Sequence, residues 1–270
     1  MRIVSLCPSL TELVFDLGRG DDLVGRTKFC VHPEGRVERV ESVGGTKDPK
    51  VARIAALAPD LVLLNEEENR REDADALRDA GLRLHTSMPR DAADTAAMVR
   101  SIAAALDRAD DGERIAADIE RRAARVREAA RGRPPVRWAY LIWRRPYMTV
   151  NADTFVHALL GLAGGENVFG ALPERYPAVE PAQIAAADPD VVLLSSEPFP
   201  FRDTHADELA ALTGLPRERF RLADGELLSW HGSRTPAGID YAESLVRDVA
   251  VRPERRPAHA DAPHSTSSSA

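Results

Sequence analysis

The sequence predicts an α/β protein with two similar, Rossmann-like lobes, each built on a parallel sheet, and one long helix that joins them. The main observation is an internal repeat: Ile54–Leu64 returns as Ile184–Leu194, and both copies place Pro-Asp before four apolar residues. Each copy indicates a helix end, a turn and a short strand buried on both faces. Strands that alternate with helices, without hairpin signals, favour parallel sheets.

A second, weaker repeat supports the same division. Gly20–Gly25 resembles Gly165–Gly170, and each segment follows an apolar helical pattern, at 11–17 and at 154–162. Two repeats in the same order indicate two similar strand–helix lobes.

The predicted elements divide the chain into four segments. Residues 1–90 form the first lobe, with strands at 3–6, 23–24 and 61–64, and the pattern Ser9–Glu12 is typical of a capping box that opens its first helix. Residues 91–133 carry the linking helices, at 91–106 and 112–130. A helix of about 18 residues spans roughly 27 Å, enough to run between two lobes.

The rest of the chain forms the second lobe and a tail. Pro134-Pro135 ends the long helix, and the lobe of residues 134–252 begins with a strand at 136–143. Residues 253–270 are rich in Pro, His, Ser and Ala, which predicts a disordered tail.

Composition excludes several classes of protein. The 270 residues include 36 Lys plus Arg against 43 Asp plus Glu, a net charge of −7, whereas nucleic-acid binders usually carry a basic surplus. Two cysteines rule out a disulfide-stapled scaffold. The sequence contains no run of about 18 apolar residues, so it does not predict a membrane-spanning helix.

The N-terminus bears on the expected compartment. Met1-Arg2 leads straight into Ile3-Val4-Ser5-Leu6, without the basic and apolar regions of an export signal. We therefore expect a cytoplasmic protein from this sequence, or a periplasmic or cell-surface one if the export signal lies outside it.

The strand ends nominate the functional site, because ligands of parallel sheets bind beyond the carboxyl ends of the strands. Aromatic and polar side chains gather there in a chain with few aromatics, which suits a flat, partly apolar ligand. The candidate ligand-binding residues are Ser9, Lys28, Cys30, His32, Glu67, Asn69, Trp143, Arg144, Tyr147, Glu197, Trp230, His231 and Arg234.

Each candidate also has a structural interpretation. Cys30 and His32 are weak candidates for metal ligands, or for a nucleophile and its base, because residues two apart on an extended loop point to the same side; a structural pair is the alternative. The acids 66–68 are a solvated helix start or part of the site. Trp143 and Trp230 are ligand contacts rather than core residues, and Arg144 clamps an anion or is simply exposed.

No catalytic motif is present. The sequence lacks a GxSxG elbow, a Walker loop and an HExxH pair. We therefore expect a protein that is not an enzyme, and a cysteine-dependent enzyme is the least favoured alternative.

Three segments in order resemble a known superfamily: residues 2–18, the Leu-Ala-Pro-Asp-Leu-Val repeat, and residues 164–169. The chain is similar to the helical-backbone metal receptors, the cobalamin- and ferric-siderophore-binding proteins of ABC importers. Segments such as 28–33, 44–47, 141–150, 195–201 and 229–234 resemble a subgroup that often lacks a signal peptide.

The resemblance implies a function. Two lobes joined by a long helix would bind a metal chelate in the cleft between them, a corrinoid or a ferric chelate held as ligand and not as a covalent cofactor, and deliver it to an ABC permease. Glu72 and Glu208 are the candidates for the permease-docking acids. The alternative is a cytoplasmic carrier or sensor of such a chelate that has no permease.

Overall fold

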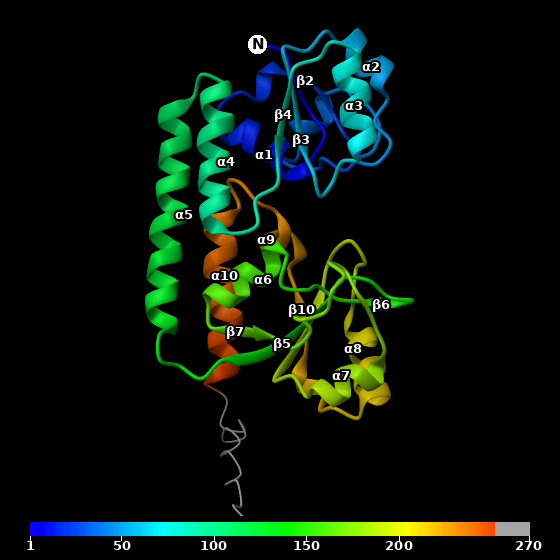
Figure 1. Ribbon diagram of the computed structural model, residues 1–270, viewed down its shortest axis with the longest axis vertical. Coiled ribbons are helices and arrows are strands. Elements are labelled where there is room, and N and C mark those ends of the chain that lie inside the picture. Colours follow the sequence, from blue (N-terminus) through cyan, green and yellow to red (C-terminus); the bar gives the residue numbers. More distant parts are fainter. Residues whose placement is uncertain (252–270) are drawn as a thin grey trace, which may run out of the picture.

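The computed structural model describes residues 1–251, which form two α/β lobes stacked along a column of long helices (Figure 1). The N-terminal lobe holds a parallel sheet of four strands in the order β2-β1-β3-β4. Its elements are β1 (Ile3–Ser5), α1 (Pro8–Asp16), η1 (Gly20–Asp22), β2 (Leu23–Arg26), η2 (Val37–Arg39), α2 (Val51–Ala56), β3 (Leu61–Asn65), α3 (Arg71–Asp79) and β4 (Leu84–Ser87).

The C-terminal lobe holds a second parallel sheet of four strands, in the order β10-β9-β5-β7. Two helices, α4 (Ala92–Ala105) and α5 (Ala109–Ala130), connect the lobes. The elements of the second lobe are β5 (Val136–Leu141), β6 (Tyr147–Met148), α6 (Phe155–Leu162), β7 (Gly165–Asn167), β8 (Ala178–Val179), α7 (Pro181–Ala187), β9 (Val191–Ser195), α8 (Asp203–Thr213), η3 (Arg217–Arg219), β10 (Phe220–Ala223), α9 (Gly225–Ser229) and α10 (Thr235–Ala250).

The two sheets have the same strand order, which confirms the predicted fold class. β1, β2, β3 and β4 occupy the places of β5, β7, β9 and β10. The stronger repeat falls on β3 and β9, and the weaker one on β2 and β7. Gly20 and Gly165 open the weaker repeat because no side chain fits there: a Cβ would lie 2.1 Å from the Phe15 ring or 2.6 Å from the Trp138 indole.

The Pro-Asp turn of the stronger repeat ties each repeated strand to its neighbour. Asp60 Oδ2 accepts a hydrogen bond from the backbone N–H of Arg2 at 2.6 Å, and Asp190 Oδ2 accepts one from Arg137 at 2.8 Å. Both arginines also donate from their side chains to carbonyls at the end of the preceding helix, those of Leu57 and of residues 187 and 188. The repeat therefore preserves a set of hydrogen bonds to the backbone that fixes the register of the central strands.

Three local predictions were wrong. Cys7, not Ser9, caps α1 without a side-chain bond, because Pro8 occupies the first helical turn. The strand predicted at 136–143 ends at Leu141. The chain then turns back, and β6 pairs with β8 as an antiparallel ribbon that no sequence signal indicated.

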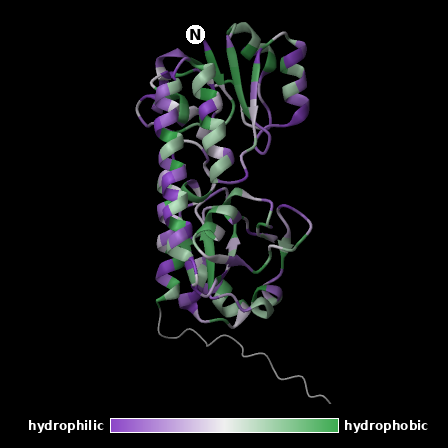
Figure 2. Ribbon diagram, turned by 60° about the vertical axis from the view of Figure 1, so that its left-hand side comes forward, coloured by the Kyte–Doolittle hydropathy of each residue, from purple (hydrophilic) through white to green (hydrophobic). Residues whose placement is uncertain are grey.

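One hydrophobic core runs through both lobes. Its largest cluster includes strand residues of each lobe, such as Leu63 and Leu193, together with Ile119 of α5 and Ile239 of α10. Smaller clusters cover the far face of each sheet. Figure 2 shows hydrophobic strands in both lobes and hydrophilic residues along the outside of the long helices.

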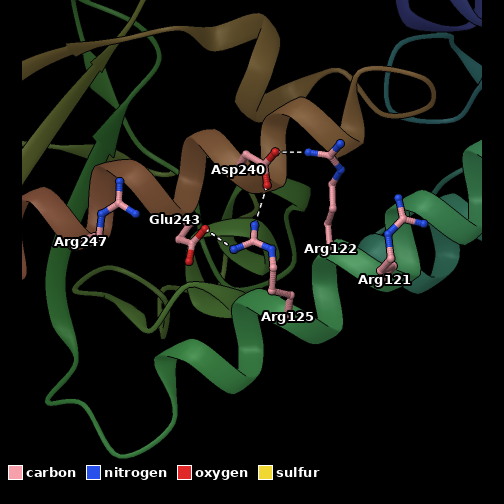
Figure 3. A pocket seen from close by; sticks show the side chains of 6 residues that line it. All are labelled: Arg121, Arg122, Arg125, Asp240, Glu243 and Arg247. Atoms are coloured by element: carbon pink, nitrogen blue, oxygen red, sulfur yellow. Dashed lines mark hydrogen bonds and ion pairs between the residues drawn. The ribbon is translucent and has the colours of Figure 1, made fainter.

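Ion pairs join α5 to α10 on the outer side. Arg125 donates to Asp240 at 2.7 Å and to Glu243 at 2.8 Å, and Arg122 also pairs with Asp240 (Figure 3). These side chains, with Arg121 and Arg247, line an open hollow of about 530 Å³. The hollow lies on the helices and away from the strand ends where the site is predicted.

Two further predictions concern the C-terminal tail and membrane-spanning helices. The tail predicted at 253–270 falls outside the described residues. Within residues 1–251, no helix combines the length and the apolar character that a bilayer span requires.

We expect Asp60→Ala and Asp190→Ala each to lower the free energy of unfolding by about 1–2 kcal/mol, because each leaves a backbone N–H without its carboxylate partner. Chemical denaturation measures the change. Asp79→Ala, at the exposed end of α3, is the control and should change the free energy of unfolding little. If Asp60→Ala is as stable as the control, the turn carboxylate is not the feature that the repeat preserves.

Candidate functional site

The carboxyl ends of the strands in the two lobes meet, and their side chains contact one another across the boundary. Ion pairs cross it, among them His32–Glu226 at 3.1 Å, Arg234–Glu12 at 2.5 Å and Arg175–Glu67 at 3.0 Å. We call this region the interlobe face and define it by Ser9, Glu12, His32, Asn65, Glu67, Glu68, Arg175, Glu197, Glu226, Trp230, His231 and Arg234.

His231 seals the inner part of the interlobe face. It is only 6% exposed, and its Nε2 lies 3.1 Å from Asn65 Nδ2 and 3.3 Å from Ser9 Oγ. Burial lowers the pKa of His231 to about 4, so the ring is neutral at physiological pH. Because the Asn65 amide can only donate from its nitrogen, Nε2 is the acceptor and the ring proton is on Nδ1.

Asn65 also shapes the acidic loop that follows β3. Its Oδ1 accepts the backbone N–H groups of Glu67 at 3.0 Å and Glu68 at 3.3 Å. Asn69 closes the loop by donating to the carbonyls of Leu6 and Thr46. Helix α3 begins only at Arg71, so the acids 66–68 form a turn and not the helix start that was one interpretation of them.

Carboxyl groups gather on the inner side of the interlobe face. Burial raises the pKa of Glu197 to about 7; the N–H of Trp230, which donates to Glu197 at 2.8 Å, opposes this shift, and the charges of Glu226 and Glu68 add to it. Burial also raises the pKa of Glu68, against the attraction of Lys47. Near neutral pH, Glu197 can therefore donate a hydrogen bond from a protonated carboxyl as well as accept one.

The two predicted tryptophan anchors differ in exposure. Trp230 is 8% exposed, packed edge-on against His32 at 5.5 Å and covered by the Arg234 guanidinium at 4.9 Å from its ring centre. Trp143 is 40% exposed and meets the ring of Phe199. Trp230 thus helps to join the lobes, and Trp143 is the one that offers open aromatic surface.

Arg144 and Tyr147 are engaged within their own lobe. Arg144 Nη2 lies 2.8 and 2.7 Å from the two carboxylate oxygens of Glu208, and the Tyr147 hydroxyl lies 3.5 Å from the same group. Glu208, one of the docking candidates, therefore balances the charge of Arg144. The other docking candidate, Glu72, is exposed in the first turn of α3.

Cys30 and His32 are not brought together. Cys30 is 1% exposed, and its Sγ accepts a hydrogen bond from the Thr11 hydroxyl at 3.0 Å. The backbone turns between Thr27 and Cys30, just before the segment 30–32. Burial raises the pKa of the Cys30 thiol, which leaves it protonated and a poor nucleophile.

Cys7 is also a protonated thiol, because burial raises its pKa to about 12. Within residues 1–251, no three or more His, Cys, Asp or Glu side chains are grouped so that they could hold a metal ion. Lys28 is exposed and lies over the ring of Phe29. Neither a bare metal centre nor a cysteine nucleophile is therefore supported by the geometry.

Several residues of the interlobe face were not predicted. Asn65 could have been found, because it directly follows the repeated strand. Glu12 was assigned to a capping box, and Arg175 lies on a loop with no predicted strand before it. Glu226, in the short helix α9, carries no motif of its own.

The raised pKa of Glu197 predicts a pH dependence of stability. A carboxyl whose pKa in the folded protein, about 7, exceeds its unfolded value stabilises the fold fully at low pH, and this contribution is lost as pH rises through about 7. Glu197→Gln keeps the acceptor for Trp230 and removes the charge. We expect the variant to exceed the wild type in free energy of unfolding by about 2 kcal/mol at pH 8 and to match it near pH 4.

Denaturation curves at the two pH values test this expectation. The difference in free energy of unfolding between variant and wild type isolates the effect of Glu197, because His231 titrates in both proteins and its contribution cancels. The exposed Glu38→Gln serves as the control. Equal differences at pH 4 and pH 8 would show that folding leaves the pKa of Glu197 unchanged.

Comparison with known proteins places these features in a family. The family described as "Periplasmic binding protein" matches residues 3–215. The vitamin B12-binding protein of Vibrio parahaemolyticus is 27% identical over 196 residues, 72% of this chain and 70% of the relative. That of Vibrio cholerae is 23% identical over 244 residues, 90% of this chain and 87% of the relative.

Solved structures show the same architecture. The crystal structure of the periplasmic vitamin B12-binding protein of Vibrio cholerae has a TM-score of 0.81 at 21% identity and covers 93% of this chain and 98% of its own. A periplasmic heme-binding protein from Roseiflexus sp. RS-1, in its apo form, has a TM-score of 0.80 at 27% identity and covers 92% of this chain and 98% of its own.

These similarities confirm the resemblance that the sequence motifs indicated. The relatives and structural neighbours are binding proteins and not enzymes, so the prediction of a protein without catalytic activity is also confirmed. With the matched region covering most of the described lobes, the chain belongs to the periplasmic binding protein family.

Proposed function

We propose that this protein binds a cobalamin-like metal chelate at the interlobe face and delivers it to an ABC permease. The observation that carries the proposal is the meeting of polar and aromatic side chains at the carboxyl ends of both sheets, where ligands of parallel sheets bind. Relatives named for vitamin B12 binding support a corrinoid as the ligand class, and a haem-like or ferric chelate is the alternative.

The charges at the interlobe face favour a ligand with a neutral rim. Carboxyl groups outnumber the two arginines there, and both Arg175 and Arg234 are already paired with glutamates. The rim of a corrinoid carries neutral amides, whereas haem carries two carboxylates that would meet like charges. A protonated Glu197 can donate to an amide oxygen, and Glu67 and Glu226 can accept from amide N–H groups.

A binding screen tests the function directly. Purified protein is titrated with aquocobalamin, hemin and ferrioxamine by calorimetry and absorbance. The proposal predicts that aquocobalamin binds most tightly of the three. Absence of binding of all three below about 100 μM would refute the function.

Trp143→Ala should weaken the affinity for aquocobalamin at least tenfold, because Trp143 follows the carboxyl end of β5 and a large exposed ring at strand ends is a typical binding anchor. The melting temperature should stay within a few degrees, since 40% of the Trp143 surface is already exposed to solvent. Arg121→Ala, on the outer side of α5, is the control and should change neither quantity.

Trp230→Ala is expected to behave differently. It removes a buried indole that donates to Glu197 and packs on His32, so it should lower both affinity and melting temperature. If Trp143→Ala also unfolds the protein, its ring belongs to the fold of the C-terminal lobe and not to the ligand site.

Docking on a permease would use one acid from each lobe, Glu72 and Glu208. Glu72→Lys should lower uptake of cobalamin in a deletion strain of the native host that expresses the variant, while the affinity of the purified variant for aquocobalamin stays unchanged. Uptake equal to that of wild type would remove Glu72 from the docking surface. Recovery of the native protein in the cytosolic fraction would instead favour a carrier that acts without a permease.

A further inference from the structure

Two carboxyl groups at the interlobe face have no cation bound to them. Glu197 follows β9 and accepts a hydrogen bond from the Trp230 indole N–H at 2.8 Å, but forms no ion pair within residues 1–251. Glu68 follows β3, and its carboxyl forms neither a hydrogen bond nor an ion pair with the described residues. Because β3 and β9 carry the internal repeat, the two acids occupy similar places in the two lobes.

The titratable groups that surround Glu197 are mostly acids. Glu226 in α9 and Asp224 just before it belong to the same lobe, and Glu68 acts on Glu197 from the N-terminal lobe. Tyr140, on β5, adds a neutral phenol whose pKa is raised by burial. An ionised Glu197 is therefore repelled by its charged neighbours on both sides of the lobe boundary.

The cations of the interlobe face are held by other acids. Arg234 pairs with Glu12 at 2.5 Å and with Glu226 at 2.8 Å. His32 also pairs with Glu226, at 3.1 Å. These contacts hold the lobes together but leave the charge of Glu197 uncompensated.

Glu68 is compensated only in part. Lys47 attracts it, but the Lys47 ammonium already donates to the backbone carbonyl of Glu67 at 2.7 Å. The charge of Glu67 repels Glu68, and the protonated thiol of Cys7 is a further titratable group that interacts with it. Glu68 and Glu197 thus share the same condition, a carboxyl largely removed from water without a cation of its own.

Contact between the lobes acts on both carboxyls in the same direction. It removes water from them and brings two like charges toward each other, and each effect disfavours the ionised form. A carboxyl that binds a proton avoids both costs and needs no cation. The arrangement with the lobes in contact, which we call closed, therefore binds protons more tightly than one in which water reaches these groups.

We propose that Glu68 and Glu197 form a proton-dependent switch, in which protonation of this pair holds the two lobes together and loss of the proton favours their separation. The inference concerns the lobes themselves and does not depend on which ligand the protein binds. Closure is favoured fully at low pH, and this advantage is lost as pH rises through the pKa of Glu197 in the closed protein, about 7. For one proton, the ratio of closed to open molecules falls by up to about tenfold for each pH unit.

Energy transfer between two dyes measures the separation of the lobes in the ligand-free protein. Asp79→Cys in α3 and Ala211→Cys in α8 give exposed labelling sites in the two lobes, on the side away from the long helices (Figure 1). The native Cys7 and Cys30 are buried and should stay unlabelled. Transfer efficiency should fall as pH rises from 5.5 to 8.5, a range in which His231 stays neutral.

Neutral variants of the two acids identify the groups that titrate. Glu197→Gln keeps an acceptor for Trp230 but cannot ionise, so transfer should stay high and lose most of its pH dependence. Glu68→Gln should also reduce the pH dependence, and it removes no hydrogen bond on which the fold relies. The exposed Glu38→Gln is the control and should behave as the labelled wild type.

His32 provides the competing explanation, because an imidazole changes charge between pH 5 and 8 and a protonated ring would strengthen the pair with Glu226. His32→Gln keeps a donor and does not titrate. If this variant loses the pH dependence while Glu197→Gln retains it, the imidazole is the switch and the proposal is wrong. Transfer that is constant with pH in the wild type, or that falls equally in Glu197→Gln and Glu68→Gln, also overturns it. Since no ligand is present, each of these results leaves the proposed function untouched.

Discussion

The structure depends on one hydrophobic core that both lobes share. The side chains of α5 and α10 that bury against this core, such as Ile119 and Ile239, are fully excluded from solvent, and the cluster reaches the central strands of each sheet. Rotating one lobe against the other about this side would expose part of it, at about 25 cal/mol for each Å² of apolar surface. The ion pairs of Arg125 with Asp240 and Glu243 hold the same helices together. The helical side is thus the rigid part of the molecule.

The opposite side is held by weaker contacts. His32–Glu226, Arg234–Glu12 and Arg175–Glu67 are partly exposed ion pairs, and such pairs contribute at most about 1 kcal/mol each. Neutral His231 adds a buried bridge to Asn65 and Ser9 farther in. A small opening can therefore separate the polar pairs while the shared core stays intact. For the proposed ligand site, this division would allow entry without the hinge bending that two extended linkers would permit.

The fold was predictable from the sequence because its two lobes share the same turn before a central strand. The Pro-Asp turn before β3 and β9 binds the neighbouring backbone, and a feature of that kind leaves a recognisable repeat. The site was predictable only in part. His32, Trp230, His231 and Arg234 were among the predicted candidates, but Glu226, the partner of His32 and Arg234, comes from a short helix whose position depends on tertiary packing. The two-residue spacing of Cys30 and His32 did not predict the environment of Cys30, because its thiol is buried against Thr11 and Thr27.

The pairing of charges at the interlobe face bears on selectivity. A ligand bound at this face as proposed would have to replace the bonds that Arg234, Arg175 and His32 make across the boundary, because a polar group covered by the ligand and left unpaired loses both its partner and water. Apolar surface alone cannot meet this requirement. A chelate whose rim both donates and accepts hydrogen bonds can meet it. On the proposed function, the self-paired face would discriminate against ligands that match its shape but lack these groups.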